Sequence, residues 1–286
     1  MQQYYVGSDR VNLLKKIDRP SMVSAYAVRD RKSDISINAN QNWMMDSGAF
    51  TQVTNFGDFV ICPEKYIRIA MRFEHSGRLD CIATQDYMCE PDVINKLREK
   101  GREASVRIHQ RKTIDRFIRL KKEARKQGLG VPVMPVLQGW EVEDYVEHFK
   151  MYQDLINLPT HYYLPGPYGA YFPVKRNWNQ WLGIGSTCKR NKNPEIVSNI
   201  IDALEEYWDE QCIKKNGFRI HLFGFKKTGL RLASIRDRIY SADSFAYDYA
   251  NRMKGGDRRS ETRATEATDF HDEIVNQPVQ ACLQLT

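Results

Sequence analysis

The feature that most constrains the fold is a regular alternation between short apolar segments and longer amphipathic ones. Seven short apolar segments have the length and composition of strands, and an eighth leads into Asp243. The seven are residues 21–28, 42–45, 79–83, 131–137, 161–164, 181–185 and 218–223. The segments around and between them carry apolar residues at helical spacing, at 10–17, 63–76, 91–101, 112–127, 141–156, 194–215 and 227–240. Repeated strand–helix units of this kind predict a parallel sheet.

Eight such units in roughly 240 residues predict an α/β fold of the closed (β/α)8 or TIM type. An open, doubly wound sheet is the structural alternative, and two prolines in 131–137 argue against a central place for that strand. We expect one barrel domain, the catalytic one, over residues 1–253. Residues 254–286 are polar and contain Gly-Gly-Asp-Arg-Arg, which predicts a C-terminal tail that is at most partly helical and otherwise disordered.

Composition narrows the classes of function. No run of about 18 apolar residues is present, and residues 1–5 lack the pattern of a signal peptide, so we expect a cytoplasmic protein without a membrane span. The six cysteines form no Cys-x-x-Cys pair and no close cluster with histidine, so no metal site is predicted. The net charge of +7 favours a polyanionic partner, although solvated lysines on helix faces give the same balance.

Acidic, amide and glycine residues follow the predicted strands at the point where each strand ends. They are Asp46, Asp86, Gln138-Gly139, Gly183 with Gly185, Gly224 and Asp243. Active sites of barrels form at the carboxyl ends of the strands, and glycine there lets a flat ligand approach the backbone. Each residue alone could also have a purely structural role, such as a turn or helix cap for Asp46 and Asp243. Their common position favours a site in which Asp46 and Asp243 meet across the barrel mouth.

Five of these segments resemble, in the same order, motifs of the tRNA-guanine transglycosylase superfamily. Residues 46–50, Asp-Ser-Gly-Ala-Phe, are similar to the Asp-Ser-Gly-Gly-Phe motif of that family, and Gln138-Gly139 is similar to its Gln-Gly-Gly segment. Residues 183–186 resemble a shortened Gly-Gly-x-x-x-Gly-Glu loop, and 221–224 resemble Tyr-Leu-Met-Gly. Residues 241–245 match the place of the Asp-x-Phe-Asp nucleophile motif. Within that superfamily, the residues of these motifs are most similar to those of the phage and bacterial DpdA-like DNA-guanine transglycosylases, which insert 7-deazaguanines into DNA.

The resemblance implies base exchange at C1′ of a nucleoside in DNA, in the cytoplasm of the host if the gene belongs to a phage. Asp243 would be the covalent nucleophile and Asp46 the general acid and base, without a cofactor. The DNA, a 7-deazaguanine base such as 7-cyano-7-deazaguanine, and partner proteins of a DNA-modification system would be the partners, with no membrane. The residues implied in binding the base are Ser47, Gly48, Phe50, Asp86, Gln138, Gly139, Gly183, Gly185, Phe223 and Gly224.

Basic residues in loops near the expected mouth are candidates for binding phosphates. They are Lys175, Arg176, Lys189, Arg190, Lys192 and Arg252. For each of them, a solvated charge is the alternative. The target base would have to leave the duplex to reach the site.

Three other functions stay open. The RNA enzymes carry a Cys-x-Cys-x-x-Cys…His zinc site after the nucleophile motif, and only His271 and Cys282 follow Asp243 here, so we expect no zinc subdomain. A tRNA-guanine transglycosylase without that subdomain is the first alternative. A barrel glycoside hydrolase is the second, with Trp140 and Trp181 as candidate sugar-stacking residues. A nucleic-acid-binding subunit without catalysis is the third.

Overall fold

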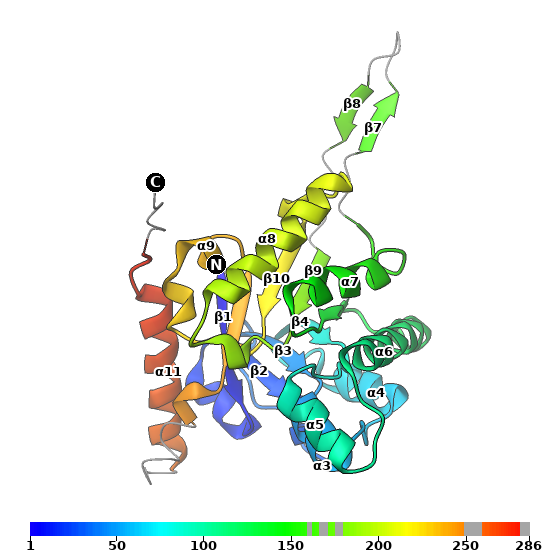
Figure 1. The fold of residues 1–286 in the computed structure, drawn as a ribbon. Coiled ribbons are helices and arrows are strands. Elements are labelled where there is room, and N and C mark those ends of the chain that lie inside the picture. The colour runs from blue at the N-terminus through cyan, green and yellow to red at the C-terminus, as the bar shows by residue number, and fades with distance from the viewer. Residues whose placement is uncertain (159–161, 166–170, 175–179, 249–258, 281–286) are drawn as a thin grey trace.

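A sheet of nine parallel strands forms the centre of the molecule (Figure 1). The computed structural model describes residues 1–158, 162–165, 171–174, 180–248 and 259–280. The order of strands in the sheet is β5-β4-β3-β2-β1-β11-β10-β9-β6. Their bounds are β1 Gln3–Ser8, β2 Ser21–Ser24, β3 Asn42–Asp46, β4 Arg78–Ala83, β5 Val133–Met134, β6 Val136–Leu137, β9 Gln180–Ile184, β10 Phe218–Leu222 and β11 Ser241–Ser244.

The two ends of this order, β5 and β6, are halves of one segment, and the sheet therefore curls into a barrel. On one side, Pro132 and Met134 accept hydrogen bonds from Ile82 and Thr84 at 3.1 and 3.0 Å. On the other side, the carbonyls of Pro135 and Leu137 accept from Gly183 and Gly185, both at 2.8 Å. Proline lacks an N–H but keeps its carbonyl. Pro135 can therefore stand between β5, which pairs with β4, and β6, which pairs with β9. Counting β5 and β6 as one strand gives eight, and the predicted (β/α)8 barrel is confirmed.

One predicted barrel strand was wrong and one barrel strand was missed, although the number eight was right. The first barrel strand is β1, which the sequence analysis did not assign and which pairs with both β2 and β11. The segment 161–164, predicted as the fifth barrel strand, contributes instead to β7 (Tyr162–Pro165), which pairs antiparallel with β8 (Tyr171–Val174) in a separate hairpin. This hairpin projects away from the barrel (Figure 1).

Helices surround the sheet and bury their apolar faces against it (Figure 1). Their bounds are α1 Leu14–Ile17, α2 Ala25–Val28, α3 Ala49–Phe56, α4 Pro63–Phe73, α5 Pro91–Glu99, α6 Val106–Gln127, α7 Val142–Tyr152, α8 Glu195–Glu210, α9 Ala233–Arg236 and α11 Ser260–Asn276. The barrel interior is filled by a separate apolar cluster that includes Tyr5, Met22, Met44, Met134 and Trp181. No helix in the described ranges combines the length and the apolar composition needed to cross a bilayer.

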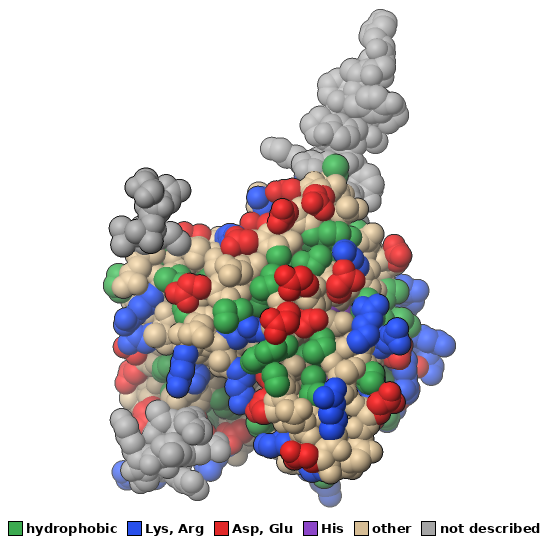
Figure 2. All heavy atoms as spheres, viewed as in Figure 1, with side chains coloured by type: hydrophobic (Ala, Val, Ile, Leu, Met, Phe, Trp, Pro, Cys, Tyr) green, Lys and Arg blue, Asp and Glu red, His purple; other side chains and the backbone are tan. Residues whose placement is uncertain are grey.

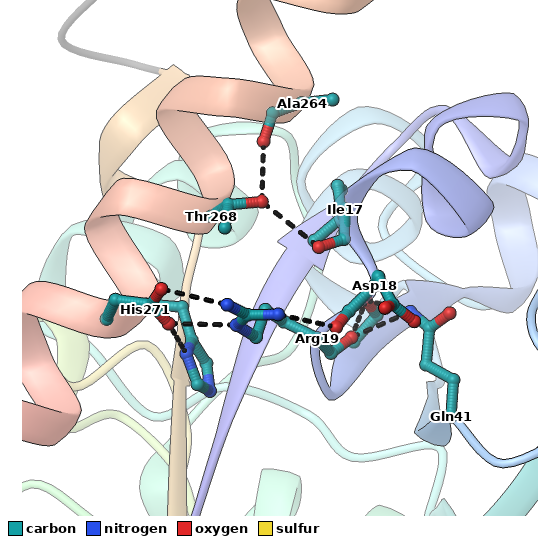
Figure 3. Close-up of polar contacts among 9 residues, drawn as sticks. Ile17, Asp18, Arg19, Gln41, Ala264, Thr268 and His271 are labelled. Atoms are coloured by element: carbon teal, nitrogen blue, oxygen red, sulfur yellow. Dashed lines mark hydrogen bonds and ion pairs between the residues drawn. The ribbon is translucent and has the colours of Figure 1, made fainter.

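The segment expected as a polar tail contains α11, which packs against the barrel beside β1 and α1. Arg19 binds Asp272 through two hydrogen bonds of 2.8 and 2.9 Å, and Thr268 donates to the Ile17 carbonyl at 3.0 Å (Figure 3). Five residues on its inner face are buried, namely Arg263, Ala264, Ala267, His271 and Ile274. The predicted boundary at residue 253 falls in 249–258, outside the described residues.

Candidate active site

A cavity of about 630 Å³ lies at the carboxyl ends of the barrel strands. Its described lining residues come from at least five different strand ends, because parallel strands present these ends on one side of the barrel. Nine residues singled out in the sequence lie in its wall: Asp46, Gly48, Phe50, Asp86, Gln138, Gly185, Phe223, Gly224 and Asp243. Residues almost two hundred positions apart in the chain are therefore brought into one site.

Asp243 lies in β11 and is held at one of its two carboxylate oxygens. The Gly224 N–H donates to Oδ1 at 2.8 Å, and Nε2 of the buried His221 lies 3.3 Å from the same oxygen. Oδ2 has no hydrogen-bond partner within the described part of the chain, and Asp243 lines the cavity. The alternative role of helix cap belongs to Ser244, whose hydroxyl accepts from the Ala246 N–H at 3.1 Å.

Asp46 ends β3, and its environment favours the protonated form of the carboxyl. Burial raises the pKa of Asp46 to about 7, and the nearby carboxylate of Asp86 adds to this effect. The Gly48 N–H, which donates to Oδ2 at 2.9 Å, acts in the opposite direction, and the charge of Asp243 raises the pKa further. Asp46 thus stabilises a turn and also interacts electrostatically with Asp243. In the sheet, β1 and β2 lie between the strands that carry these two residues.

A row of polar side chains continues from Asp46 along the cavity wall. Asp86 Oδ1 accepts from the Ser47 hydroxyl at 3.2 Å, and Oδ2 accepts from the Gln138 amide. The Gln138 carbonyl oxygen accepts from the Ser186 hydroxyl at 2.7 Å, so the amide orientation is determined at both ends. Burial raises the pKa of Asp86 to about 6, while the hydrogen bond from Gln138 opposes that shift.

Two glycines at the cavity are required by geometry. Gly48 has a φ of +75°, and a Cβ there would lie 2.6 Å from the Ser24 hydroxyl oxygen. At Gly185, a Cβ would lie 2.1 Å from the Gln138 amide nitrogen. A side chain at residue 185 would therefore displace the amide that contacts Asp86.

Three of the predicted base-binding residues lie outside the described lining. Ser47 is buried behind Asp86, which it contacts. Gly139 packs against Asp144 and Tyr145, and Gly183 packs against Phe223 and Val136. These residues support the cavity wall rather than form its surface.

The predicted phosphate-binding residues differ in how far they are engaged with the protein. Arg190 is buried, donates to the Trp140 carbonyl, and lies with its guanidinium 4.5 Å from the centre of the Trp140 ring. Lys189 forms an ion pair of 3.2 Å with Asp92 at the surface. Lys192 is also exposed. Lys175, Arg176 and Arg252 lie outside the described residues.

Both tryptophans proposed for sugar stacking lie away from the described cavity lining. Trp181 is 3% exposed and packs edge-on against Tyr240 inside the barrel, while Trp140 lies beneath Arg190. Neither tryptophan is therefore placed to stack on a sugar in the cavity.

The structure adds site residues that the sequence analysis did not name. Glu90 and Ser186 line the cavity, and His221 lies behind Asp243. Asp9 and Asp248 line its rim, and both form ion pairs with the buried Arg263 of α11. In the sequence, the only indication that His221 belongs to the site was the resemblance of residues 221–224 to a family motif. Asp9 and Ser186 could have been found because each lies just after the end of a barrel strand, β1 or β9.

The cavity lining is acidic, although the whole chain has a net charge of +7. Six acidic side chains line it, namely Asp9, Asp46, Asp86, Glu90, Asp243 and Asp248, and no lysine or arginine occurs among its described lining residues. Lysine and arginine side chains instead gather over the end of the molecule formed by α6 (Figure 2). The described residues hold no group of three or more histidine, cysteine or acidic side chains arranged to bind a metal ion.

Comparison with known proteins gives one family match. Residues 1–159 match the model of the family described as DpdA, deoxypurine in DNA protein A. The matched part includes Asp46, Asp86 and Gln138 and ends before Asp243. None of the curated proteins matches the chain. Among solved structures, a doubly substituted flavocytochrome b2 with sulfite bound is similar at 10% identity and a TM-score of 0.43, over 100% of this chain and 68% of that one.

Proposed function

The chain belongs to the DpdA family, deoxypurine in DNA protein A, and from this premise we propose that it is a DNA-guanine transglycosylase. It exchanges guanine in DNA for a 7-deazaguanine base, such as 7-cyano-7-deazaguanine, through a covalent glycosyl-aspartate. The observation that carries the proposal is the pairing of two unlike carboxyls in one cavity. Asp243 has one oxygen held and the other available, and Asp46 has a pKa of about 7.

Asp243 is the nucleophile in this proposal. Oδ2 forms a bond to C1′ as the bond from C1′ to the guanine ring nitrogen breaks, which gives a glycosyl ester and free guanine. The Gly224 N–H holds Oδ1 at 2.8 Å, which orients the carboxylate and leaves the attack to Oδ2. The transition state resembles an oxocarbenium ion, which the negative charge of Asp243 stabilises as in retaining glycosidases.

Asp46 moves the protons. In its protonated form it donates a proton to the leaving guanine, and as a carboxylate it then accepts the ring N–H proton of the incoming base. The nitrogen of that base attacks C1′, and the ester bond to Asp243 breaks. A pKa of about 7 lets one carboxyl perform both steps near neutral pH.

Asp86 and Gln138 read the base. A carboxylate accepts from the N1–H and 2-amino groups, which guanine and its 7-deaza analogues share. The Gln138 amide lies next to Asp86, and the backbone of Gly185 lies against Gln138. In this proposal these two groups meet the 6-oxo group of the base. Phe50 is 65% exposed at the rim and provides a surface on which a base taken out of the stack can lie.

The test is a base-exchange assay on DNA containing labelled guanine, with tRNA as the second substrate. Wild type should release label from DNA when a 7-deazaguanine is added. Asp243→Asn should abolish release while DNA binding and thermal unfolding stay unchanged, because the amide keeps the shape and loses the nucleophile. Asp115→Asn, which changes an exposed carboxylate on α6, is the matched control and should retain activity.

The covalent intermediate has its own readout. With the incoming base omitted, denaturing gels should show a protein–DNA species in wild type or in Asp46→Asn, and none in Asp243→Asn. An adduct that persists in Asp243→Asn would assign the nucleophile to another residue. Release from tRNA but not from DNA would favour the RNA-modifying alternative.

A further inference from the structure

A second, smaller hollow adjoins the cavity at the barrel mouth. It has a volume of about 240 Å³, and its wall shares Asp9 and Ala27 with that of the cavity. The rest of its lining comes from the segment after β1, from the segment after α2 and from the first residue of α11, namely Arg10, Val11, Asn12, Leu13, Arg31 and Ser260. Because the two hollows share part of their walls, a chain-like ligand with one unit in the cavity can extend into the smaller one.

Two arginines of this hollow carry positive charge that the described residues do not neutralise. Arg10 is exposed, and its guanidinium forms no hydrogen bond or ion pair with the described part of the chain. Arg31 is half-buried and donates to the Asn12 side-chain oxygen at 3.1 Å. It also donates to the carbonyls of Ser33 and Asp34 at 3.1 and 3.2 Å. None of these acceptors is an ion, so the charge of both arginines remains available to a ligand.

The acidic residue in the described wall of this hollow is already paired. Asp9 lies 3.2 Å from the buried Arg263 of α11, which offsets its charge. The hollow therefore presents an excess of positive charge. The cavity next to it has no lysine or arginine among its described lining residues. A phosphate thus finds no cation in the cavity wall and finds two in the adjoining hollow.

The position of Arg31 is fixed before any ligand binds. Its hydrogen bond to Asn12 joins the segment after α2 to the segment after β1. Arg72 of α4 donates to the carbonyls of Arg31 and Lys32 and so holds the same segment from the other side. A guanidinium held in this way loses little conformational freedom on binding, and its planar donors match the oxygens of a phosphate.

We propose that Arg10 and Arg31 bind one backbone phosphate of the DNA strand, close to the guanine whose base enters the cavity. A contact of this kind positions the nucleotide over the cavity without reading its sequence. The site rests on the function proposed above and gives the DNA backbone a place beside the mouth. Neither arginine is among the basic residues that the sequence analysis singled out for binding phosphates.

The experiment uses single-stranded oligonucleotides that contain one guanine and carry one uncharged methylphosphonate in place of a phosphate. The replacement is placed in turn at each of the phosphates nearest to the guanine on its two sides. Binding is measured by fluorescence anisotropy with Asp243→Asn, so that no bond to DNA forms during the titration. One strand of the series should bind about tenfold more weakly than the unmodified strand, as expected for the loss of a hydrogen bond between charged groups.

Arg10→Gln and Arg31→Gln, each added to Asp243→Asn, should weaken binding of the unmodified strand. Each should also reduce the difference between the unmodified and the sensitive strand by about threefold or more, because the protein change and the DNA change remove the same contact. Arg125→Gln, which changes an exposed arginine in the last turn of α6, is the matched control and should leave that difference unchanged. Arg10 has no side-chain partner in the described part of the chain, so Arg10→Gln tests the site even if Arg31→Gln does not fold.

Equal binding of all the strands, or a difference that persists in full in both arginine variants, overturns the phosphate site. The exchange of labelled guanine by wild type tests the proposed function separately. Exchange without any effect of methylphosphonate leaves the function and removes the site. An effect of methylphosphonate that depends on Arg10 and Arg31, without exchange, leaves the site as a DNA contact and removes the function. A failure to bind DNA at all removes both.

Discussion

Individual residues of the cavity carry pKa values that tie the site to the stability of the protein. Burial raises the pKa of Asp46 to about 7 and that of Asp86 to about 6. An unfolded chain would ionise both near pH 4. The folded state therefore binds more protons than the unfolded state in the range between these values.

The pH dependence of stability should reveal Asp46. The stabilising contribution of its protonated form is complete below about pH 4, falls as pH rises because the unfolded state ionises first, and is lost above about pH 7. One such group contributes a slope of up to about 1.4 kcal/mol per pH unit. Asp46→Asn should therefore flatten the decrease in unfolding free energy between pH 4.5 and 7, measured by urea denaturation. A slope equal to that of wild type would show that Asp46 ionises normally, and Asp115→Asn serves as the control.

Much of the site could be predicted at the level of residues because barrel chemistry collects at strand ends. Asp46, Asp86, Gln138 and Asp243 lie at or within a few residues of the ends of short apolar segments, so their positions could be seen without coordinates. Glu90 could not be found in this way, because it follows a loop and opens a helix, and its burial depends on Cys188 and Ser186 from a distant part of the chain. The contact of Arg190 with Trp140 likewise depends on tertiary structure.

Among the secondary-structure elements, those with strong periodicity were predicted best. The helices α4, α5 and α8 begin within one residue of the predicted starts. The strand β1 has only six residues and contains Tyr4 and Tyr5, whose burial comes from neighbours on both sides. The segment at β7 has the composition of a strand, and composition cannot tell a barrel strand from one arm of a hairpin.

The helix α11 contributes to the cavity rim through one buried charge. Arg263 has a side chain 4% exposed and pairs with Asp248 and with Asp9. Arg263→Leu should cost about 3–5 kcal/mol of unfolding free energy, because it leaves carboxylate charge buried without the guanidinium. Arg19→Leu, which breaks the more exposed pair with Asp272, should cost roughly 1 kcal/mol or less. Equal losses in the two variants, measured by urea denaturation, would contradict the structural role of Arg263.

For the whole molecule, the positive charge and the cavity occupy different places. The cavity lining is acidic, and lysine and arginine gather over α6 (Figure 2). Under the proposed function, attraction of a nucleic-acid backbone must therefore come from basic residues outside the cavity. Lys192 is exposed in the loop after β9, which also contributes Ser186 and Cys188 to the cavity lining.

Salt dependence should test this division. Lys192→Ala should reduce the slope of log binding constant against log salt concentration by about 0.9 on duplex DNA and about 0.7 on single strands, if Lys192 contacts one phosphate. Lys215→Ala is the control, because it removes an exposed lysine that lies just before β10 and so at the amino ends of the strands, opposite the mouth. Equal slopes for wild type and Lys192→Ala in fluorescence-anisotropy titrations would assign Lys192 to plain solvation.

The pairing of β1 with β11 has a consequence for synthesis on the ribosome. Gln3 lies opposite Ser241 and Tyr5 lies opposite Asp243, so a strand made at the start must wait for one made more than two hundred residues later. Contacts of such long sequence separation form slowly, and the barrel wall stays open until β11 has emerged. Because β11 also carries Asp243, the nascent chain acquires its proposed nucleophile only in the step that closes the barrel. An incomplete chain released early would therefore have neither a closed wall nor the means to form a bond with DNA.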